Sequence, residues 1–363
     1  LNFLALFLIA LLRVKTINLT EVATGFRNRA MQSSNYKRLQ RFFKNYNLEY
    51  SVIAKAIVTL MDLPQPWVLS LDRTNWSFGQ IDFNILMLTV VHEGVGYPLM
   101  WTFLDKKGNS NTEERMDLLN RFEREFPEVE VAYLCGDREF IGKPWLTYLL
   151  LDPIIRFRLR IRETDLISDG QKKFPAKTVF AHLQPGQQEI LNSRRWGGRD
   201  ARMRFGHFSR PFWGRLVYVS ALRLEDGELL IVISPDSPET AISDYANRWG
   251  IETLFGMFKT RGFCLESTHF TDPQRLSKLL ALMSLAMCWA MKVGEWLHSH
   301  TPLKVRFPMR GKPALGSHLK VKKHGRREKS LFRYGLDHLR SVVNDLDIKH
   351  HQFLECLQFL SCT

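Results

Sequence analysis

Short apolar runs bounded by turn residues follow one another after residue 66, a pattern typical of buried strands. They lie at 67–71, 81–91, 97–104 and 129–135. Before the last run, Ser110 and Glu113 form a capping-box pattern that predicts the start of a helix, and Pro127 predicts its end. Three strands, a helix and a further strand indicate the beginning of an α/β domain.

The chain ahead of this domain is predicted to be helical. Residues 1–12 are apolar, but a membrane span needs about 20 residues, so a buried helix is expected there. The run lacks the basic stretch and the cleavage site of a signal peptide. From 13 to 49, apolar residues alternate with basic ones, which fits a small helical DNA-binding unit. Pro64 and Pro66 then predict a linker at 61–66, because proline prevents a helix from continuing.

The pattern changes again between 161 and 242, where turn pairs separate short strand-like runs. Strands are predicted at 179–183, 216–222 and 229–234, with turns at 185–186, 197–198 and 226–227. Seven arginines and two tryptophans accompany them, namely Arg194, Arg195, Arg199, Arg202, Arg204, Arg210, Arg215, Trp196 and Trp213. We interpret this stretch as a β-rich insertion with a surface that faces nucleic acid. The largely apolar run 273–300 is explained as a core helix.

Charge is unevenly distributed along the chain. The 363 residues carry 51 Lys and Arg against 37 Asp and Glu, a net charge of +14. Segment 13–49 has eight basic residues and two acidic ones, and segment 304–333 has eleven and one, so two basic flanks surround a nearly neutral body. Such flanks suit a polyanion, because each neutralised phosphate releases counterions. A solvated basic tail is the simpler alternative for the C-terminal flank.

Composition is that of an ordinary globular protein. Hydrophobic residues make up 45% and charged residues 24%, which excludes a mostly disordered chain. Five cysteines without a Cys-x-x-Cys pair argue against a disulfide scaffold and against a cysteine-based zinc site. We therefore expect a protein of a reducing, intracellular setting, away from the membrane.

Four polar residues share one face of a predicted helix. At about 100° per residue, they fall within an arc of about 60°; they are Tyr245, Arg248, Glu252 and Lys259. The neighbouring face is apolar and would anchor the helix in a core, through Ile251, Leu254, Phe255 and Phe258. One carboxylate therefore lies among a phenol and two cations. A surface ion pair of Glu252 with Arg248 or Lys259 is the alternative that needs no function.

Two further carboxylates count against a simple ion pair. Asp72 and Asp137 each follow an apolar strand, where sheet edges commonly gather catalytic groups. With Glu252 they form an oxygen-rich set suited to Mg²⁺ or Mn²⁺. Two such ions about 3.5–4 Å apart activate a nucleophile and stabilise the leaving oxygen of a phosphodiester. Glu266 competes with Glu252 as the third carboxylate, although it follows Gly262 and lies off the helical face.

Three motifs contain these carboxylates: Leu-Asp-Arg-Thr-Asn-Trp at 71–76, Cys-Gly-Asp-Arg-Glu-Phe at 135–140, and a Tyr-x2-Arg-x3-Glu-x6-Lys run at 245–259. From about residue 13 to 300 the sequence resembles a bacterial insertion-sequence transposase of the Asp-Asp-Glu (DDE) type that bears the Tyr-Arg-Glu-Lys signature. The resemblance implies an α/β fold with a ribonuclease-H-like catalytic core, a β-strand-rich insertion and an N-terminal helical DNA-binding domain.

The expected organisation combines this resemblance with the patterns above. A helical DNA-binding domain is expected at 1–62 and the first part of the core at 67–160. The β-rich insertion follows at 161–242, and the catalytic helix with the end of the core at 243–300. A basic C-terminal region is expected at 301–363.

The resemblance also assigns roles and partners. The metal ligands would be Asp72, Asp137 and Glu252, which would hold two Mg²⁺ or Mn²⁺ ions. Tyr245, Arg248 and Lys259 would grip phosphates at the transposon end, roles that suit a phenol, a bidentate guanidinium and a point charge. The expected partner is double-stranded DNA, at terminal inverted repeats and at the target. A cytoplasmic protein is implied, with no membrane partner and with a dimer in the synaptic complex.

Families with this signature typically cut both strands through a hairpin on the transposon end. Water first frees a 3′-OH, that hydroxyl attacks the opposite strand, hydrolysis opens the hairpin, and the ends join target DNA. Hairpin formation distorts DNA, and a base flipped onto an aromatic side chain relieves the distortion. Trp196, Trp213 and Trp249 are candidates for that stacking residue, with a core role as the alternative for each.

Two other functions fit parts of this pattern. A DNA-binding repressor without catalysis, such as a truncated or domesticated relative, would keep the basic flanks. A structure-selective nuclease would keep the three carboxylates, but it has no need of the Tyr-Arg-Glu-Lys spacing. The presence of all three carboxylates favours an active, metal-dependent transposase.

Overall fold

The structure, a computed structural model, describes residues 2–78, 80–151, 155–168, 172–191, 217–307 and 325–360. The chain divides into two units. The helical unit comprises Leu1–Leu48, Thr59–Met61 and Gly256–Thr363, and the sheet unit comprises Glu49–Val58 and Asp62–Phe255. Of the sequence-predicted features, the seven arginines, Trp196, Trp213 and most of the basic stretch after residue 304 lie outside the described residues.

The apolar runs of the sheet unit form one eight-stranded mixed sheet. Its strands, in spatial order, are β3 (Val95–Phe103), β2 (Ile81–His92), β1 (Trp67–Phe78), β4 (Val131–Gly136), β5 (Phe157–Arg160), β10 (Leu229–Ser234), β9 (Tyr218–Arg223) and β8 (Gln188–Leu191). Strands β1, β4 and β5 are parallel, and all other neighbours are antiparallel. The fold is therefore mixed α/β with a large central sheet, as predicted at this level.

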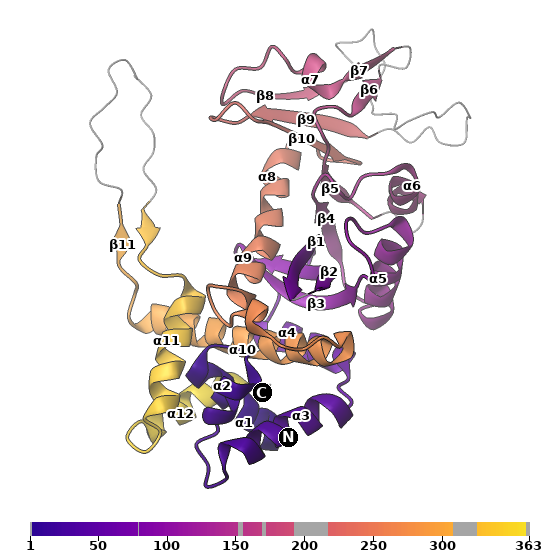
Figure 1. Cartoon of the computed structure of the whole chain (residues 1–363). Helices are drawn as coiled ribbons and strands as arrows, with labels where there is room; N and C mark the ends of the chain where they lie inside the picture. The colour runs from indigo at the N-terminus through magenta and orange to yellow at the C-terminus, as the bar shows by residue number, and fades with distance from the viewer. Residues whose placement is uncertain are drawn as a thin grey trace. The chain divides into compact units, whose positions relative to one another are not determined.

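Helices cover this sheet on both sides. Figure 1 shows α5 (Thr112–Glu125) and α6 (Lys143–Leu151) on one side of β1, β4 and β5, and α8 (Ala241–Tyr245) on the other. A 3₁₀ turn, η3 (Ala246–Arg248), joins α8 to α9 (Trp249–Phe258). Helix α4 (Tyr50–Met61) precedes the sheet, and the hairpin of β6 (Leu166–Ser168) and β7 (Lys173–Pro175) with α7 (Ala176–Val179) lies in the predicted insertion.

Four local predictions need correction. The capping box of α5 uses Asn111 and Glu114, one residue later than predicted, because the Asn111 side chain accepts the N–H of Glu114. Segment 179–183 is not a strand, since α7 ends at Val179 and a turn follows. Strand β1 continues past Leu71 to Phe78, because it pairs with β2 along its whole length. The predicted helix 245–259 is divided by η3 and ends at Phe258.

The helical unit is built around one long helix. It contains α1 (Asn2–Val14), α2 (Leu19–Thr24), α3 (Gln32–Asn45), α10 (Pro273–His300), α11 (Leu331–Asn344) and α12 (His350–Leu357), with short turns η4 (Leu265–Ser267) and η5 (Gln358–Leu360) and a small hairpin of β11 (Val305–Arg306) and β12 (Arg326–Arg327). Helices α10 and α11 approach closely at glycine, since a Cβ on Gly335 would lie 1.9 Å from the carbonyl oxygen of Ala290.

The first helices of the chain share their core with the last ones. Buried Lys278 of α10 donates a hydrogen bond to the carbonyl oxygen of Phe43 in α3 (2.9 Å), and Arg13 of α1 donates to that of Val343 in α11 (2.8 Å). These contacts join residues more than 200 positions apart, which no local pattern reveals. The five predicted segments stay predictions as domains, and the helical unit combines the first part of the chain with the last.

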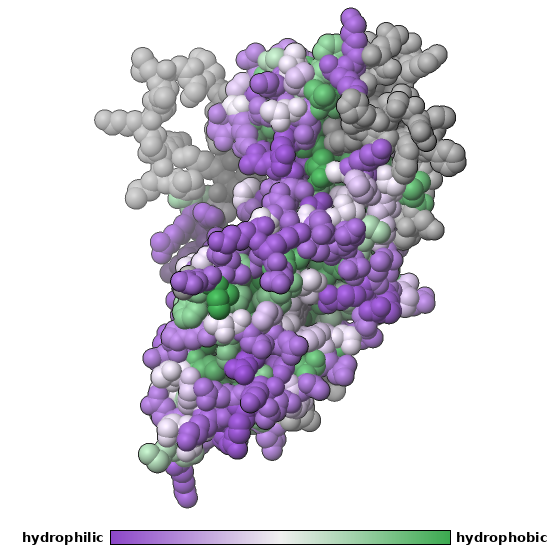
Figure 2. Space-filling model, turned by 45° about the vertical axis from the view of Figure 1, so that its right-hand side comes forward, coloured by the Kyte–Doolittle hydropathy of each residue, from purple (hydrophilic) through white to green (hydrophobic). Residues whose placement is uncertain are grey.

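Helix α10 is long and apolar enough to cross a membrane, and it is the one such helix among the described residues. Most of its apolar window (83%) is buried within the protein, as in the core helix of a folded unit. Figure 2 shows a face on which hydrophilic residues predominate and apolar residues form smaller patches between them.

Candidate active site

The register of two parallel strands brings the two aspartates together. Strand β1 pairs with β4 up to Leu71 and Gly136, so Asp72 and Asp137 occupy equivalent positions on adjacent strands, one residue further on. Each carboxylate accepts a hydrogen bond from the next backbone N–H, of Arg73 and Arg138 respectively, both at 2.7 Å. The two side chains therefore have the same local geometry at the point where the β1–β4 pairing ends.

Arg248 connects one of these aspartates to the glutamate of the signature. Its Nη1 donates to Oδ2 of Asp72 at 3.1 Å, and its Nη2 donates to Oε1 of Glu252. The Arg248 side chain is 8% exposed, and its guanidinium also lies 5.4 Å from the ring centroid of Trp249. A single buried cation thus contacts two carboxylates that are 180 positions apart in the sequence.

Burial raises the pKa of Asp72 to about 6, because a buried carboxylate loses hydration when it ionises. The backbone N–H of Arg73 and the charge of Arg248 act against this rise, whereas the carboxylates of Glu139 and Asp137 add to it. The effect of the Asp137 charge on the pKa of Asp72 is consistent with the position of Asp137 at the end of the adjacent strand. The site therefore concentrates negative charge in a partly dehydrated setting.

Tyr245 reaches the second aspartate. Its hydroxyl donates to Oδ1 of Asp137 at 3.4 Å, and burial raises the pKa of this phenol well above its ordinary value. Tyr245 and Arg248 therefore each contact one of the two aspartates, and Glu252 is linked to Asp72 through Arg248, although a 3₁₀ turn interrupts the predicted helix. Helix α9 packs closely on β3, where the backbones of Gly250 and Gly96 meet. A Cβ on Gly96 would lie 3.0 Å from the carbonyl oxygen of Gly250, so this close approach depends on glycine.

Lys259 and Glu266 belong to the helical unit and contact each other. Lys259 follows the last residue of α9, and its Nζ lies 3.0 Å from Oε1 of Glu266 in η4. The structure therefore gives Glu266, the competing third carboxylate, a cationic partner of its own. Glu252 is instead the carboxylate that shares Arg248 with Asp72.

An ion pair missed by the sequence reasoning, between Arg73 and Glu139, lies beside Asp72 and Asp137. Arg73 binds both carboxylate oxygens of Glu139, each at 2.7 Å, and also Asn84 at 2.7 Å. Glu139 thus lies in a turn after β4, paired with the residue next to Asp72. The available signal was the two motifs themselves, since Arg73 follows Asp72 directly and Glu139 lies two residues after Asp137.

A second arginine anchors the helix that leads to Tyr245. Arg158 of β5 is 4% exposed and donates to Asp244 of α8 and to Asp236, both at 2.9 Å. Its guanidinium also lies 4.9 Å from the ring centroid of Tyr133. Residues 157–160 read Phe-Arg-Leu-Arg, and arginines that alternate with large apolar residues are the sequence signal for such a buried pair.

The metal ligands predicted from the sequence are the three carboxylates Asp72, Asp137 and Glu252. Within the described part of the chain, no group of three or more His, Cys, Asp or Glu side chains is arranged to hold a metal ion. The donor chemistry nevertheless fits a divalent cation, because hard carboxylate oxygens are the ligands of Mg²⁺ and Mn²⁺. Asp72 and Glu252 already share a cation, the guanidinium of Arg248.

The family model of the transposase DDE domain matches residues 64–289 of this chain. The chain belongs to this family. It is therefore a transposase of the DDE type, and the biological process is DNA transposition. Transposases of this type generally use divalent metal ions. The resemblance to this type that was found in the sequence is confirmed.

Solved structures offer a more distant comparison. Eight solved chains match, among them a cryo-EM structure of a piggyBac transposase synaptic complex with hairpin DNA. That similarity covers 96% of this chain and 80% of the other, at 9% identity and a TM-score of 0.43. The assignment to the family therefore rests on the family model. No curated protein matches the chain.

Proposed function

We propose that this DDE transposase cuts an insertion sequence at its terminal inverted repeats and joins the 3′-OH ends to target DNA. The observation that carries the proposal is the contact of Arg248 with both Asp72 and Glu252. The register of β1 and β4 supports it, because Asp72 and Asp137 follow the last paired residues of these adjacent strands. Three acidic residues that are distant in the sequence are thus linked within the sheet unit, as the ligands of one active site would be. The strand order β3-β2-β1-β4-β5 supports a ribonuclease-H-like core, which β10, β9 and β8 of the insertion extend.

The catalytic residues in this proposal are Asp72, Asp137 and Glu252, which would hold two Mg²⁺ or Mn²⁺ ions. Bound there, the metal supplies an activated nucleophile and stabilises the leaving oxygen of a phosphodiester. Arg248 pairs with Asp72 and Glu252, and its buried Nε has no hydrogen-bond partner among the described residues. If a metal ion binds these carboxylates, the Arg248 guanidinium becomes available to a phosphate. Arginine binds a phosphate through two parallel hydrogen bonds.

DNA contacts are assigned to the rest of the signature. Tyr245 and Arg248 border the aspartate pair and would bind phosphates of the transposon end together with Lys259. Trp249 is 60% exposed although it is a large aromatic residue, and it lies against the Arg248 guanidinium. This exposure supports Trp249 as the residue on which a flipped base stacks.

The reaction sequence follows the order implied by the family resemblance. Water attacks one strand at the transposon end and frees a 3′-OH, which then attacks the opposite strand and forms a hairpin. Hydrolysis opens the hairpin before the ends join target DNA. Two ends must be held together for this cut-and-paste pathway, so a dimer on DNA is part of the proposal.

The test is a cleavage assay on end-labelled duplex DNA that carries the terminus of the element. Wild type and Glu252→Gln are compared in Mg²⁺ and in EDTA. We expect metal-dependent nicking and a hairpin product from the wild type, and neither product from the variant. Glu266→Gln is the matched control and should still cut, because Arg248 links Glu252, and not Glu266, to Asp72.

Two outcomes would contradict the proposal. Cleavage by Glu252→Gln together with an inactive Glu266→Gln would show that the third carboxylate is wrongly assigned. Salt-sensitive DNA binding by the wild type without cleavage in Mg²⁺ or Mn²⁺ would instead indicate a repressor without catalysis.

A further inference from the structure

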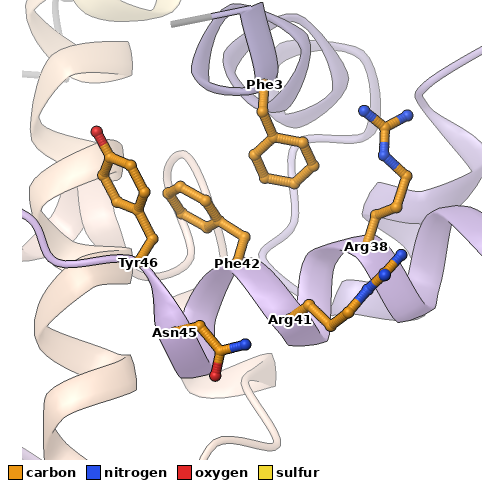
Figure 3. A pocket seen from close by; sticks show the side chains of 6 residues that line it. All are labelled: Phe3, Arg38, Arg41, Phe42, Asn45 and Tyr46. Carbon is orange, nitrogen blue, oxygen red and sulfur yellow. The ribbon is translucent and has the colours of Figure 1, made fainter.

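The helical unit contains an open hollow of about 420 Å³ at the C-terminal half of α3. Its lining combines three aromatic rings with two guanidinium groups and an amide, namely Phe3, Arg38, Arg41, Phe42, Asn45 and Tyr46. Figure 3 shows the Phe3 ring descending from α1, with Phe42 and Tyr46 on one side and the two arginines on the other. The size is within the range of sites that hold small organic groups, roughly 300–1,000 Å³.

The aromatic rings contact one another in a row, in which Phe3 is tilted against Phe42 and Tyr46 forms a stack with Phe42. The centroids of Phe3 and Phe42 lie 4.8 Å apart, and those of Phe42 and Tyr46 lie 5.0 Å apart with an interplanar angle of 21°. Tyr46 is 45% exposed, so the stack ends in an accessible phenol ring. A planar aromatic group could extend this stack without any rearrangement of the rings.

The charged residues of the pocket lining are both arginines, Arg38 and Arg41. Helix α3 contains Lys37, Arg38, Arg41 and Lys44 and no acidic residue. None of these four cations forms an ion pair with a described carboxylate. Arg38 lies over the Phe3 ring, 5.5 Å from its centroid, which directs one guanidinium toward the hollow. The ligand must therefore be anionic as well as aromatic.

We propose that this hollow, which we call the α3 pocket, binds an unpaired nucleotide of DNA. Its base stacks on Tyr46, its flanking phosphates contact Arg38 and Arg41, and the Asn45 amide is available to a base edge. Bases in a duplex are covered by their neighbours, so an exposed ring selects a single-stranded or extruded base. The inference rests on the proposed function only in taking DNA as the substrate, and it adds a nucleotide site outside the carboxylate site.

The experiment locates the site and measures its strength on the full-length chain in EDTA, which prevents cleavage. A 12-nucleotide single strand with one 5-iodouracil is cross-linked by ultraviolet light and the attachment is mapped by mass spectrometry. Binding of the same strand is measured by fluorescence anisotropy. We expect a cross-link at Tyr46 and an affinity about tenfold lower for Tyr46→Ala, because stacking is lost. Tyr46→Phe keeps the ring and should bind as the wild type does.

Two further comparisons separate stacking from charge. A strand of abasic nucleotides keeps the phosphates and should bind the wild type and Tyr46→Ala equally weakly. Arg41→Ala should weaken binding and reduce the salt dependence by about 0.7 for one lost phosphate contact on a single strand. Arg29→Ala removes an exposed charge that does not line the pocket, so it should have a smaller effect.

The inference is overturned if Tyr46→Ala binds as tightly as the wild type, if cross-links fall only on other residues, or if Arg29→Ala and Arg41→Ala have equal effects. In each of these cases cleavage of duplex ends would be unaffected, and the proposed function would stand. A wild-type chain that binds neither single-stranded nor duplex DNA would overturn the proposed function as well.

Discussion

Arginines play opposite parts in the two units. In the sheet unit, Arg73, Arg158 and Arg248 are at most 14% exposed, and each binds one or two carboxylates. On α3 of the helical unit, Arg38 and Arg41 face no described carboxylate, and Arg41 is exposed. Buried cations need partners because unpaired charge is costly away from water, whereas exposed cations remain hydrated without one.

This difference separates arginines that position carboxylates within the protein from arginines that we propose to bind a ligand. A paired, buried arginine fixes the position of its carboxylate, so its loss should affect folding and catalysis. An exposed, unpaired arginine contributes little to folding, so its loss should affect binding to a polyanion alone. Four predictions test this division, beginning with the largest effect.

Asp137→Asn should reduce DNA cleavage by about a thousandfold or more, because in the proposed function Asp137 is a metal ligand and a neutral amide is a weaker ligand than a carboxylate. Binding to duplex DNA should persist, since the substitution removes a negative charge and no cationic DNA contact. The measurement is the initial rate of strand nicking in Mg²⁺. Asp82→Asn is the matched control in the same sheet, where Asp82 pairs with exposed Lys107, and it should cut normally. Equal losses in both variants would contradict the assignment.

Arg158→Ala should lower the free energy of unfolding by about 3–5 kcal/mol, because it leaves two carboxylates without their buried partner. Arg156 contacts the same Asp236 at 3.1 Å but is 63% exposed, so Arg156→Ala should cost about 1 kcal/mol or less. Urea denaturation of both variants checks the difference. Similar losses would mean that burial does not distinguish the two pairs.

The raised pKa of Asp72 predicts a pH dependence of stability. Its pKa is about 6 in the folded chain against an ordinary value of 3.8, so the folded state holds the proton more tightly between these values. The free energy of unfolding should therefore fall as the pH rises from 3.8 through 6, by up to about 3 kcal/mol. Asp72→Asn should remove this fall. A difference between variant and wild type that is constant from pH 4 to 7 would contradict the prediction.

Arg41→Ala should change the free energy of unfolding by less than about 0.5 kcal/mol, as expected for an exposed, unpaired side chain. Its effect should appear in DNA binding, where log Kd varies less steeply with log salt after the substitution. Thermal unfolding and a salt titration of DNA binding measure the two effects. A large loss of stability would show that Arg41 has a structural partner and would weaken the contrast between the units.

Several elements were readable from local pattern alone. The apolar run 273–300 coincides with α10, and the runs near 81–91 and 229–234 coincide with β2 and β10. The capping box was displaced by one residue because Ser110 and Asn111 are both acceptable caps, and three-dimensional contacts decide between them. Segment 179–183 was wrongly taken as a strand because its apolar residues pack from a short helix and a turn.

The sequence by itself determined the family, the three candidate carboxylates and the excess of positive charge, because residue types and their spacing carry this information. The tertiary structure alone decided which side chains meet. Arg248 joins Asp72 to Glu252, Arg158 fixes Asp244, and the first helices share a core with α10 and α11. Such contacts depend on strand register and on the burial of charge between distant segments, which local patterns do not encode.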